Sequence, residues 1–250
     1  MQELCGTSRL GPISFTARQG EIVGFASQEK ADVDELFRLL FGLNPVTSGQ
    51  ILVRDRPYRP TTPLAAIRCG WALIPESRRE QGLMMDWSIS RNTALLVLDT
   101  LLSRLKLIDH QKVRLATDQS IQKLGIVTDS PEKKVGTLSG GNQQKVLLAK
   151  WLVVGPAILI LNNPTRGVDV GAKWEIYELC QQLAAKGMTI LMTSGEVDEV
   201  LGLADRVIVL SKGRTHHDFQ RGDVTQAELM HAMASTAPTE LGVHSESIDR

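Results

Sequence analysis

Short apolar runs and longer segments of helical period alternate along most of the chain. Each apolar run is bounded by glycine, proline or charged residues and has the character of a buried parallel strand. Helical patterns follow these runs, which is typical of a doubly wound α/β sheet with helices on both faces. The predicted strands cover residues 21–26, 71–75, 157–161, 188–193 and 206–210, and the last of these is expected to be the final strand.

The segments between these strands predict further elements. Residues 1–20 have an irregular pattern with a possible strand at 13–17, and residues 48–53 predict a turn and a strand before a loop at 57–63. Apolar residues at helical spacing over residues 84–135 predict helices whose apolar faces are mostly core. These apolar positions are Leu95, Leu96, Leu98, Leu101, Leu102, Leu105, Val113, Leu115, Ile121, Leu124 and Ile126.

Composition narrows the class of protein. The 250 residues carry 28 basic and 28 acidic side chains, so no net charge draws the chain to nucleic acid or to an anionic membrane. Cys5, Cys69 and Cys180 lack the spacing of a metal or redox site and predict free thiols in a reducing compartment. The most apolar stretch, residues 146–161, is interrupted by Lys150 and does not predict a membrane span. With no signal peptide evident, a transport role would place the chain in the cytoplasm, acting on a separate membrane protein.

Residues 137–146 combine a small polar residue and two glycines with the start of an apolar helix. A helix start leaves backbone N–H groups without partners, and the helix dipole makes that end positive. Gly140 and Gly141 keep side chains away, so that phosphate oxygens can approach Ser139 and the amides closely. The motif alone leaves a second interpretation open, in which Ser139 is the N-cap of an ordinary helix.

The residues that follow this helix add a second motif. The predicted strand at 157–161 leads into N-N-P-T-R-G-V-D at residues 162–169 and then into another helix. Together with L-S-G-G-N-Q-Q at residues 138–144, this resembles the nucleotide-binding domain of ATP-binding cassette (ABC) transporters. The wording L-S-G-G-N-Q-Q-K-V with P-T-R-G-V-D-V-G-A-K is similar to the second cassette of the double-cassette ATPases of bacterial ribose, galactose and xylose importers. The resemblance extends from about Leu4 to about Met233.

The resemblance implies an architecture for the whole chain. It is a P-loop NTPase-like parallel sheet core with a small antiparallel β subdomain and an inserted helical subdomain at about 84–150. A single domain over residues 1–235 is expected, in which residues 226–234 form a short helix. The polar residues 236–250 are predicted to be a flexible tail.

In this family two cassettes meet head to tail, and each ATP lies between the phosphate loop of one and the signature of the other. The resemblance therefore implies that the signature of this chain contacts ATP held by a partner cassette. The residues expected to make this contact are Ser139, Gly140, Gly141, Asn142 and Gln143.

The phosphate loop of the family, G-x-x-x-x-G-K-[ST], is expected directly after the strand at 21–26. Ser27 stands at the first glycine position and Asp32 at the second. Val33 replaces the lysine that contacts phosphate, and Asp34 replaces the hydroxyl residue that binds magnesium. No group that the loop requires is present, so we expect no tight ATP binding there.

Two charged features of this segment have alternative interpretations. Asp32 and Glu35 have the spacing of a capping box, which would place carboxylates at the position of phosphate. Lys30 lies three positions before the lysine slot and is either a displaced phosphate ligand or a solvated loop lysine.

The catalytic positions of the family are also changed. Asn162 and Asn163 hold the positions of the magnesium-binding aspartate and of the glutamate that polarises water, and Gly195 holds that of the switch histidine. Asparagine retains the shape of a carboxylate but cannot carry its charge or accept a proton. None of the histidines is placed to substitute, and each is predicted to be a surface residue: His110, His216, His217, His231 and His244.

Other residues are candidates for contacts with partners. Asp169 is predicted both to cap the following helix and to lie at the interface between two cassettes. Glu76 lies in a loop that is either a hinge and partner contact or a solvated charged loop. Residues around Met84, Met85 and Trp87 are either core or the lining of a groove for a membrane subunit's helix.

Together these observations predict the nucleotide-binding subunit or half of a bacterial sugar-type ABC importer. Its own site is degenerate, and its signature serves the ATP site of a competent partner cassette, fused or separate. ATP and Mg²⁺ are expected only at that shared site, with no metal and no nucleotide held by this chain alone. The partners are a competent cassette and a membrane permease at the inner face of the cell membrane, without nucleic acid.

Three alternatives remain. The first is a non-catalytic scaffold or regulatory module that docks to a permease without nucleotide, although scaffolding needs no Ser-Gly-Gly at a helix start. The second, a soluble cassette ATPase acting on nucleic acid or ribosomes, is disfavoured by the zero net charge and by the absence of a basic stretch. The third, a self-sufficient ATPase, requires substitutes at four sites.

Overall fold

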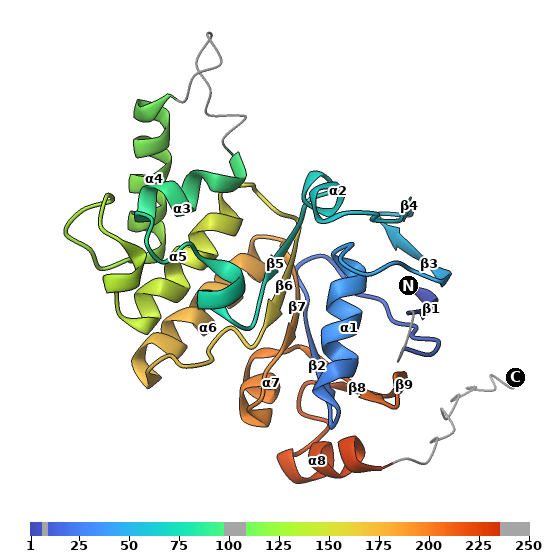
Figure 1. Cartoon of the computed structure of the whole chain (residues 1–250). Coiled ribbons are helices and arrows are strands. Elements are labelled where there is room, and N and C mark those ends of the chain that lie inside the picture. The colour runs from blue at the N-terminus through green and yellow to red at the C-terminus, as the bar shows by residue number, and fades with distance from the viewer. Residues whose placement is uncertain (7–9, 98–108, 236–250) are drawn as a thin grey trace, which may run out of the picture.

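The computed structural model describes residues 1–6, 10–97 and 109–235, with a six-stranded sheet at their centre (Figure 1). The strands, in order across this sheet, are β5 (Trp71–Ile74), β6 (Ile158–Asn162), β7 (Thr189–Thr193), β2 (Ile22–Ser27), β8 (Arg206–Ser211) and β9 (Arg214–Gln220). The first five are parallel and correspond to the five predicted strands, so the α/β fold class is confirmed.

Strand β9 shows that the prediction of a final strand at residues 206–210 was wrong. The sequence of β9, RTHHDFQ, contains no apolar run, so the local pattern carries no strand signal. Its backbone pairs antiparallel with β8 across a tight turn at Lys212 and Gly213, which both have positive φ. One well-paired neighbour is sufficient to hold this strand at the edge of the sheet.

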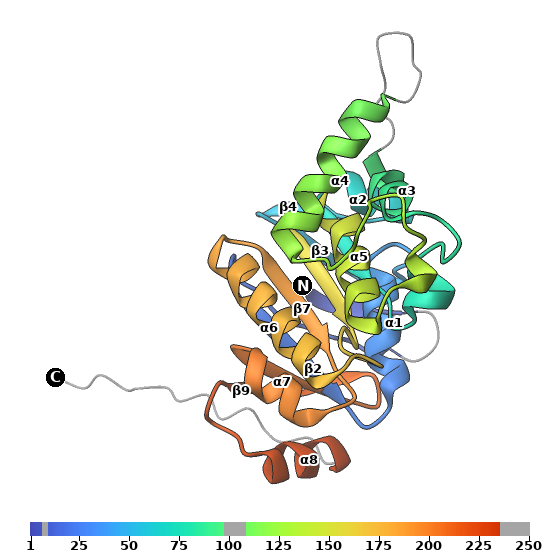
Figure 2. The same cartoon turned by 90° about the vertical axis from the view of Figure 1, so that its left-hand side faces the viewer.

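Helices cover both faces of the sheet, as predicted. Figure 1 shows α1 on one side and α6 and α7 on the other, and Figure 2 shows α6 and α7 lying across the nearer face. Helix α5 contacts β5. Helix α8 contacts β8 and lies at residues 226–234, where a short helix was predicted. The bounds are α1 (Lys30–Leu40), α5 (Gly140–Leu152), α6 (Val170–Ala185), α7 (Val197–Leu203) and α8 (Gln226–Ala234).

A second, antiparallel sheet has the order β1-β3-β4. Two expectations about this region were wrong, because residues 1–20 contain a strand and the expected loop at 57–63 begins within one. The short stretch QELC has no clear alternation, and its strand forms by pairing with β3, where Gln2 faces Gln50 and Cys5 faces Ser48. Residues 13–17 form no strand, and Ile13 makes an isolated bridge to Leu4. The elements here are β1 (Gln2–Cys5), β3 (Ser48–Val53), β4 (Arg56–Tyr58) and the following helix α2 (Pro63–Arg68).

Three helices pack together beside the main sheet: α3 (Ile89–Ala94), α4 (His110–Leu124) and α5. Val113 and Ile126 are buried, in agreement with apolar faces that are mostly core, whereas Leu115 is an exception at 61% exposed. Its side chain lies on the solvent face of α4, where the helical period is too weak to fix one apolar stripe. The predicted positions Leu98, Leu101, Leu102 and Leu105 lie outside the described residues, as does the predicted tail at 236–250.

The two sheets and their helices share one apolar core. Phe25 of β2 lies at its centre, with edge-to-face contacts to Phe15 and Phe37 at ring-centre distances of 5.0 and 5.7 Å. Among the helices that the structure describes, none has both the length and the apolar character that a membrane crossing requires.

Candidate functional site

The structure brings the changed family positions together at the carboxyl edge of the parallel sheet. The segments that follow β2, β6 and β7 lie side by side because β7 pairs with both other strands. They enclose a cavity of about 220 Å³ next to a hollow of about 360 Å³. We call the residues of these segments the degenerate site: Ser27, Lys30, Asp32, Val33, Asp34, Asn162, Asn163 and Gly195.

The start of α1 differs from the predicted capping box. The helix begins at Lys30 with Glu29 as its N-cap, so Asp32 lies inside the first turn rather than at the cap. The buried Asp32 carboxylate accepts a hydrogen bond from the backbone N–H of Gly213 at 2.9 Å. The capping-box prediction was therefore wrong, because a turn 181 residues away satisfies this carboxylate. Val33 is 1% exposed and belongs to the core.

A chain of amide and carboxylate groups occupies the catalytic positions. Asn162 donates its side-chain N–H to Asp34 Oδ1 at 2.7 Å. Its carbonyl oxygen accepts a longer hydrogen bond of 3.4 Å from Asn163. Asn163, at a φ of +50°, in turn accepts from the backbone N–H of Gly195 at 2.5 Å. The three changed catalytic positions are thus hydrogen-bonded to one another and to the altered phosphate loop.

Lys30 lies at the edge of this site and is ion-paired. Its ammonium group contacts Glu76 Oε1, although 48% of the side chain is exposed. Arg166 donates to the same Glu76 oxygen at 2.5 Å. Glu76 therefore pairs with two cations, Lys30 from the segment after β2 and Arg166 from the segment after β6, so one carboxylate serves both charges.

Magnesium and a nucleotide do not fit the degenerate site. In the family, a hydroxyl and an aspartate hold the metal, whereas here Asp34 and Asn162 are hydrogen-bonded to each other. The lysine position is occupied by the buried Val33. Among the residues that the structure describes, no three histidine, cysteine, aspartate or glutamate side chains are placed to hold a metal ion.

The signature segment begins α5 with Ser139 as its N-cap. The Ser139 hydroxyl accepts two hydrogen bonds from Asn142, a long one of 3.4 Å from the backbone N–H and one of 2.9 Å from the side-chain amide. The capping interpretation is therefore confirmed, while Ser139 itself stays exposed. Gly140 packs against the turn after β6 and Gly141 against the first turn of α6, since a Cβ at Gly140 would lie 2.9 Å from Gly167 O and one at Gly141 2.5 Å from the Cβ of Ala172.

The five signature residues differ in exposure. Gln143 is 1% exposed, and its amide N–H donates to Leu138 O at 2.9 Å. Gly141 is also buried, whereas Gly140 and Asn142 are half-buried. Of the five residues, Ser139, Gly140 and Asn142 are accessible from outside the chain, whereas Gly141 and Gln143 are buried in this conformation.

Arg78 connects three of the motif segments, a role that the sequence did not reveal. It lies in a single helical turn (Arg78–Gly82) and donates to Gln143 Oε1 at 3.2 Å. Its other N–H groups donate to the backbone oxygens of Arg166 at 2.7 Å and Gly167 at 3.0 Å. In a loop rich in charge, no local signal distinguishes Arg78 from the exposed Arg79.

Glu199 of α7 is a second residue that the sequence did not single out. Its buried Oε2 accepts hydrogen bonds of 2.5 Å from Thr165 and from Ser194, and Lys173 lies 2.9 Å from Oε1. Burial opposes ionisation of this carboxyl, but hydrogen bonds from Ser194, Thr165, Tyr177 and Lys173 hold its pKa below the ordinary value. This cluster ties the turns after β6 and β7 to α6 and α7.

The predicted capping role of Asp169 is confirmed. Its carboxylate accepts a hydrogen bond from the backbone N–H of Ala172 at 3.0 Å at the start of α6. Its predicted role between cassettes stays a prediction. His110 and His231 are exposed, as predicted, whereas His216 and His217 are half-buried on β9; His244 lies outside the described residues.

Comparison with known proteins gives the family. The sequence profile of the ABC transporter family matches residues 10–166, more than half of the chain. This chain belongs to the ABC transporter family. It is 44% identical over 228 residues to the xylose import ATP-binding protein XylG of Pseudomonas fluorescens, covering 91% of this chain and 44% of that protein. It is 43% identical over 218 residues to the ribose import ATP-binding protein RbsA of Bacillus subtilis, covering 87% and 44%.

Solved ABC cassettes share the fold. The ADP conformation of the ATP-binding cassette MJ1267 matches with a TM-score of 0.75 at 16% identity, covering 94% of both chains. CbiO1 of Clostridium perfringens, part of the ABC transporter complex cbiONQ, matches with a TM-score of 0.76 at 22% identity, covering 92% and 91%. The chain spans under half the length of the sugar-import relatives.

Proposed function

We propose that this cassette serves a bacterial sugar importer, binds no nucleotide in its own site and presents its signature to ATP held by a competent partner cassette. The sugar class comes from relatives named for xylose and ribose import. The observation that carries the proposal is the hydrogen bond of 2.7 Å between Asn162 and Asp34. It joins the two positions that would have to hold magnesium.

The charges of the degenerate site oppose a bound phosphate. Asp34 lies where the loop hydroxyl would be, and the cation of Lys30 is paired with Glu76. A phosphate oxygen about 4 Å from an uncompensated carboxylate is repelled by about 4 kcal/mol at an effective dielectric constant of 20. Such a cost equals a loss in affinity of about three orders of magnitude.

The signature, in contrast, keeps an accessible anion-binding geometry. Ser139 is exposed at the positive end of a helix that spans Gly140–Leu152, and no side chain of Gly140 covers the amides. Arg78 fixes the end of this helix to the turn after β6 through Gln143 and Gly167. The chain is thus suited to complete the ATP site of another cassette.

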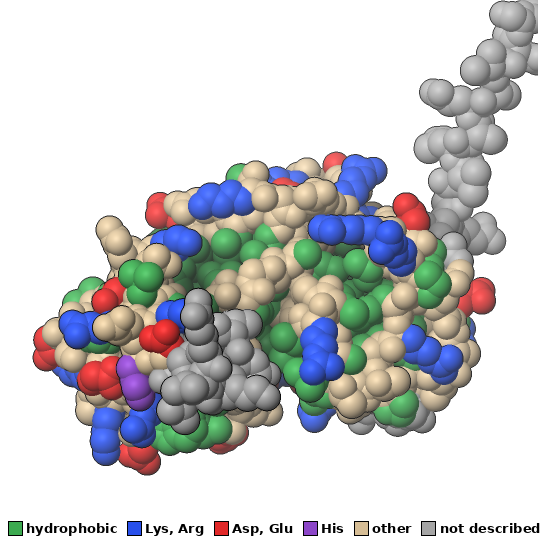
Figure 3. Space-filling model, turned by 90° about the horizontal axis from the view of Figure 1, so that it is seen from above, with side chains coloured by type: hydrophobic (Ala, Val, Ile, Leu, Met, Phe, Trp, Pro, Cys, Tyr) green, Lys and Arg blue, Asp and Glu red, His purple; other side chains and the backbone are tan. Residues whose placement is uncertain are grey.

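A permease is the proposed second partner, at the inner face of the membrane. Beside the degenerate site, the hollow of about 360 Å³ is lined by Phe37, Phe41 and Trp151, together with polar residues. Figure 3 shows apolar side chains exposed in the hollowed centre of one face of the molecule. Of the predicted groove residues, Met84 and Trp87 are 49% and 39% exposed, but they do not line this hollow.

Calorimetric titration of magnesium-ATP into the purified chain tests the first half of the proposal. We expect no saturable heat up to millimolar ATP, with an ATP-binding cassette of intact phosphate loop as the positive control. Saturable binding in the micromolar range would contradict the proposal and would indicate that Lys30 leaves Glu76 to contact phosphate.

The second half is tested in the assembled transporter with a partner cassette that binds ATP. Ser139→Asp keeps an N-cap residue of α5 but adds a negative charge facing the partner's phosphate. We expect the ATPase rate to fall at least about tenfold, since removal of a single positioned charge contact commonly costs this much. Thr62→Asp, at the N-cap of α2, is the matched control and should leave the rate unchanged.

An unchanged rate with Ser139→Asp would contradict signature sharing. If this variant also leaves sugar uptake intact while loss of the chain abolishes it, the scaffold interpretation replaces the proposal.

A further inference from the structure

A hollow at the amino-terminal edge of the parallel sheet lies apart from the degenerate site. It has a volume of about 170 Å³ and lies between β3 of the small sheet and the beginnings of β5, β6 and β7. Its lining includes Trp71, Ile158 and Thr189, the first residues of these three strands. Since the degenerate site follows the carboxyl ends of β6 and β7, the two sites lie at opposite edges of the same sheet.

The walls of this hollow combine apolar and polar surface and include two aromatic rings. Trp71 and Phe15 are 2% and 7% exposed, and Ile51 and Leu191 are buried beside them. A dry cavity of about 150 Å³ is large enough to hold a benzene molecule. The hollow therefore has the size and the wall chemistry for one aromatic ring.

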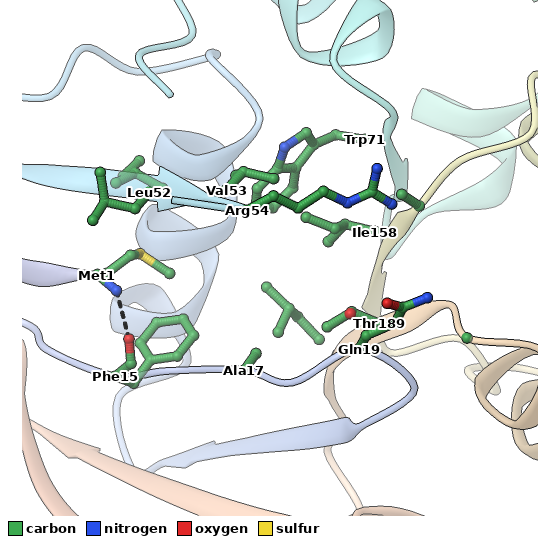
Figure 4. Close-up of a pocket in the computed structure, with 14 residues that line it drawn as sticks. Met1, Phe15, Ala17, Gln19, Leu52, Val53, Arg54, Trp71, Ile158 and Thr189 are labelled. Atoms are coloured by element: carbon green, nitrogen blue, oxygen red, sulfur yellow. Dashed lines mark hydrogen bonds between the residues drawn. The ribbon is translucent and has the colours of Figure 1, made fainter. Parts of the chain in front are cut away.

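Arg54 supplies a cation at the rim. Figure 4 shows its side chain extending from the β3–β4 connection across the hollow toward Ile158, with Gln19 and Thr189 on the facing rim. Within the part of the chain that the structure describes, the Arg54 guanidinium makes no hydrogen bond or ion pair. Its five N–H donors are available to an acceptor that comes from outside.

The backbone of Arg54 makes this residue a costly choice for the turn. Arg54 and Asp55 form a two-residue connection between the paired Val53 and Arg56, and their φ angles are +51° and +60°. Such turns favour asparagine or glycine because both central residues need positive φ. A strained arginine without a partner commonly has a functional reason.

We propose that this hollow binds a small aromatic carboxylate, with its ring against Phe15 and Trp71 and its carboxylate on the Arg54 guanidinium. Arginine pairs with a carboxylate through two parallel N–H groups, and the Gln19 amide on the facing rim offers a further donor. Inorganic anions lack the apolar part that the walls select, and neutral aromatic molecules leave Arg54 unpaired.

Titration of 3-phenylpropionate into the ¹⁵N-labelled full chain tests this site by NMR. We expect saturable shifts at the residues that line the hollow, and at least about tenfold weaker binding of 3-phenylpropionamide and of propionate. The amide removes the charge at constant shape, and propionate removes the ring. Equal binding of acid and amide, or no saturation by about 10 mM 3-phenylpropionate, would overturn the proposal.

Two variants locate the binding. Arg54→Asn removes the cation and introduces a residue that the turn favours, so the fold is preserved, and it should weaken binding about tenfold. Ala17→Phe places a ring in the hollow and should block it. Arg59→Asn, an exposed arginine outside the hollow, is the matched control and should bind as the unaltered chain does. Binding that survives both Arg54→Asn and Ala17→Phe would overturn the assignment to this hollow.

Discussion

Replacing Asn162 with aspartate restores the residue type of the family and should destabilise this chain. The Asn162 side chain donates to Asp34 Oδ1 at 2.7 Å, and both residues are half-buried. Asn162→Asp converts this hydrogen bond into contact between two carboxylates. Two such charges about 4 Å apart repel by about 4 kcal/mol at an effective dielectric constant of 20, and partial exposure reduces this by about half.

The lost hydrogen bond adds about 1 kcal/mol, so we expect a total loss of about 3 kcal/mol in the free energy of unfolding at pH 7. For a chain of this length, about 1 kcal/mol corresponds to about 2–4 °C in the melting temperature. Asn162→Asp should therefore lower the melting temperature by about 6–12 °C. Thermal unfolding followed by circular dichroism measures this change.

The pH dependence identifies the cause. Repulsion requires both carboxylates to be ionised, so it disappears when either takes up a proton. Folding then favours protonation of the pair, and the destabilisation should grow as pH rises from about 4 to 7. A loss of stability that is the same at pH 4.5 and at pH 7 would refute the electrostatic explanation.

Two further variants complete the test. Asn163→Asp is the matched control, because its acceptor oxygen for the Gly195 N–H is retained and its hydrogen bond to Asn162 is long. It should cost about 1 kcal/mol or less. Combining Asn162→Asp with Asp34→Ser replaces one carboxylate by a hydroxyl donor and should recover most of the lost stability. If Asn162→Asp and Asn163→Asp lower the stability equally, the hydrogen bond between Asn162 and Asp34 is not the cause of the loss.

Three other predictions concern single side chains, each measured by urea denaturation. Glu199→Gln should lower the free energy of unfolding by about 2 kcal/mol at pH 7. Because the pKa of Glu199 lies below its ordinary 4.5, its ionised carboxylate stabilises the fold above pH 4.5, and this stabilisation is lost as pH falls below 4.5. The variant should lack this pH-dependent part of the stability. Arg78→Met should cost about 1–2 kcal/mol through three lost hydrogen bonds, whereas Arg79→Met should change stability by less than about 0.5 kcal/mol. Asp169→Ala should cost about 1 kcal/mol by removing the N-cap of α6, and Asp169→Ser should retain most of it; equal losses would contradict the capping role.

The local pattern of residues predicted much of this molecule. The five parallel strands are apolar runs between turn residues, and burial on both faces of a sheet imposes that pattern wherever the strand lies. The N-cap of α6 was also predicted, and that of α5 was one of two interpretations, because Asp169 and Ser139 act on backbone groups three residues away. The residue types at the phosphate-loop positions can likewise be taken directly from the sequence, where Val33 and Asp34 replace the lysine and the hydroxyl residue.

Only the tertiary structure decided the features that depend on residues far apart in the sequence, namely the edge strands and the partners of polar side chains. Strands β1 and β9 have no apolar period, and each exists through its pairing with a neighbouring strand. Asp32 is bound by Gly213 and Lys30 by Glu76, so neither the capping box nor a free lysine describes this segment. A local pattern fixes the period and the buried face of an element, whereas the partner of a polar group is chosen by which segments the completed sheet brings together.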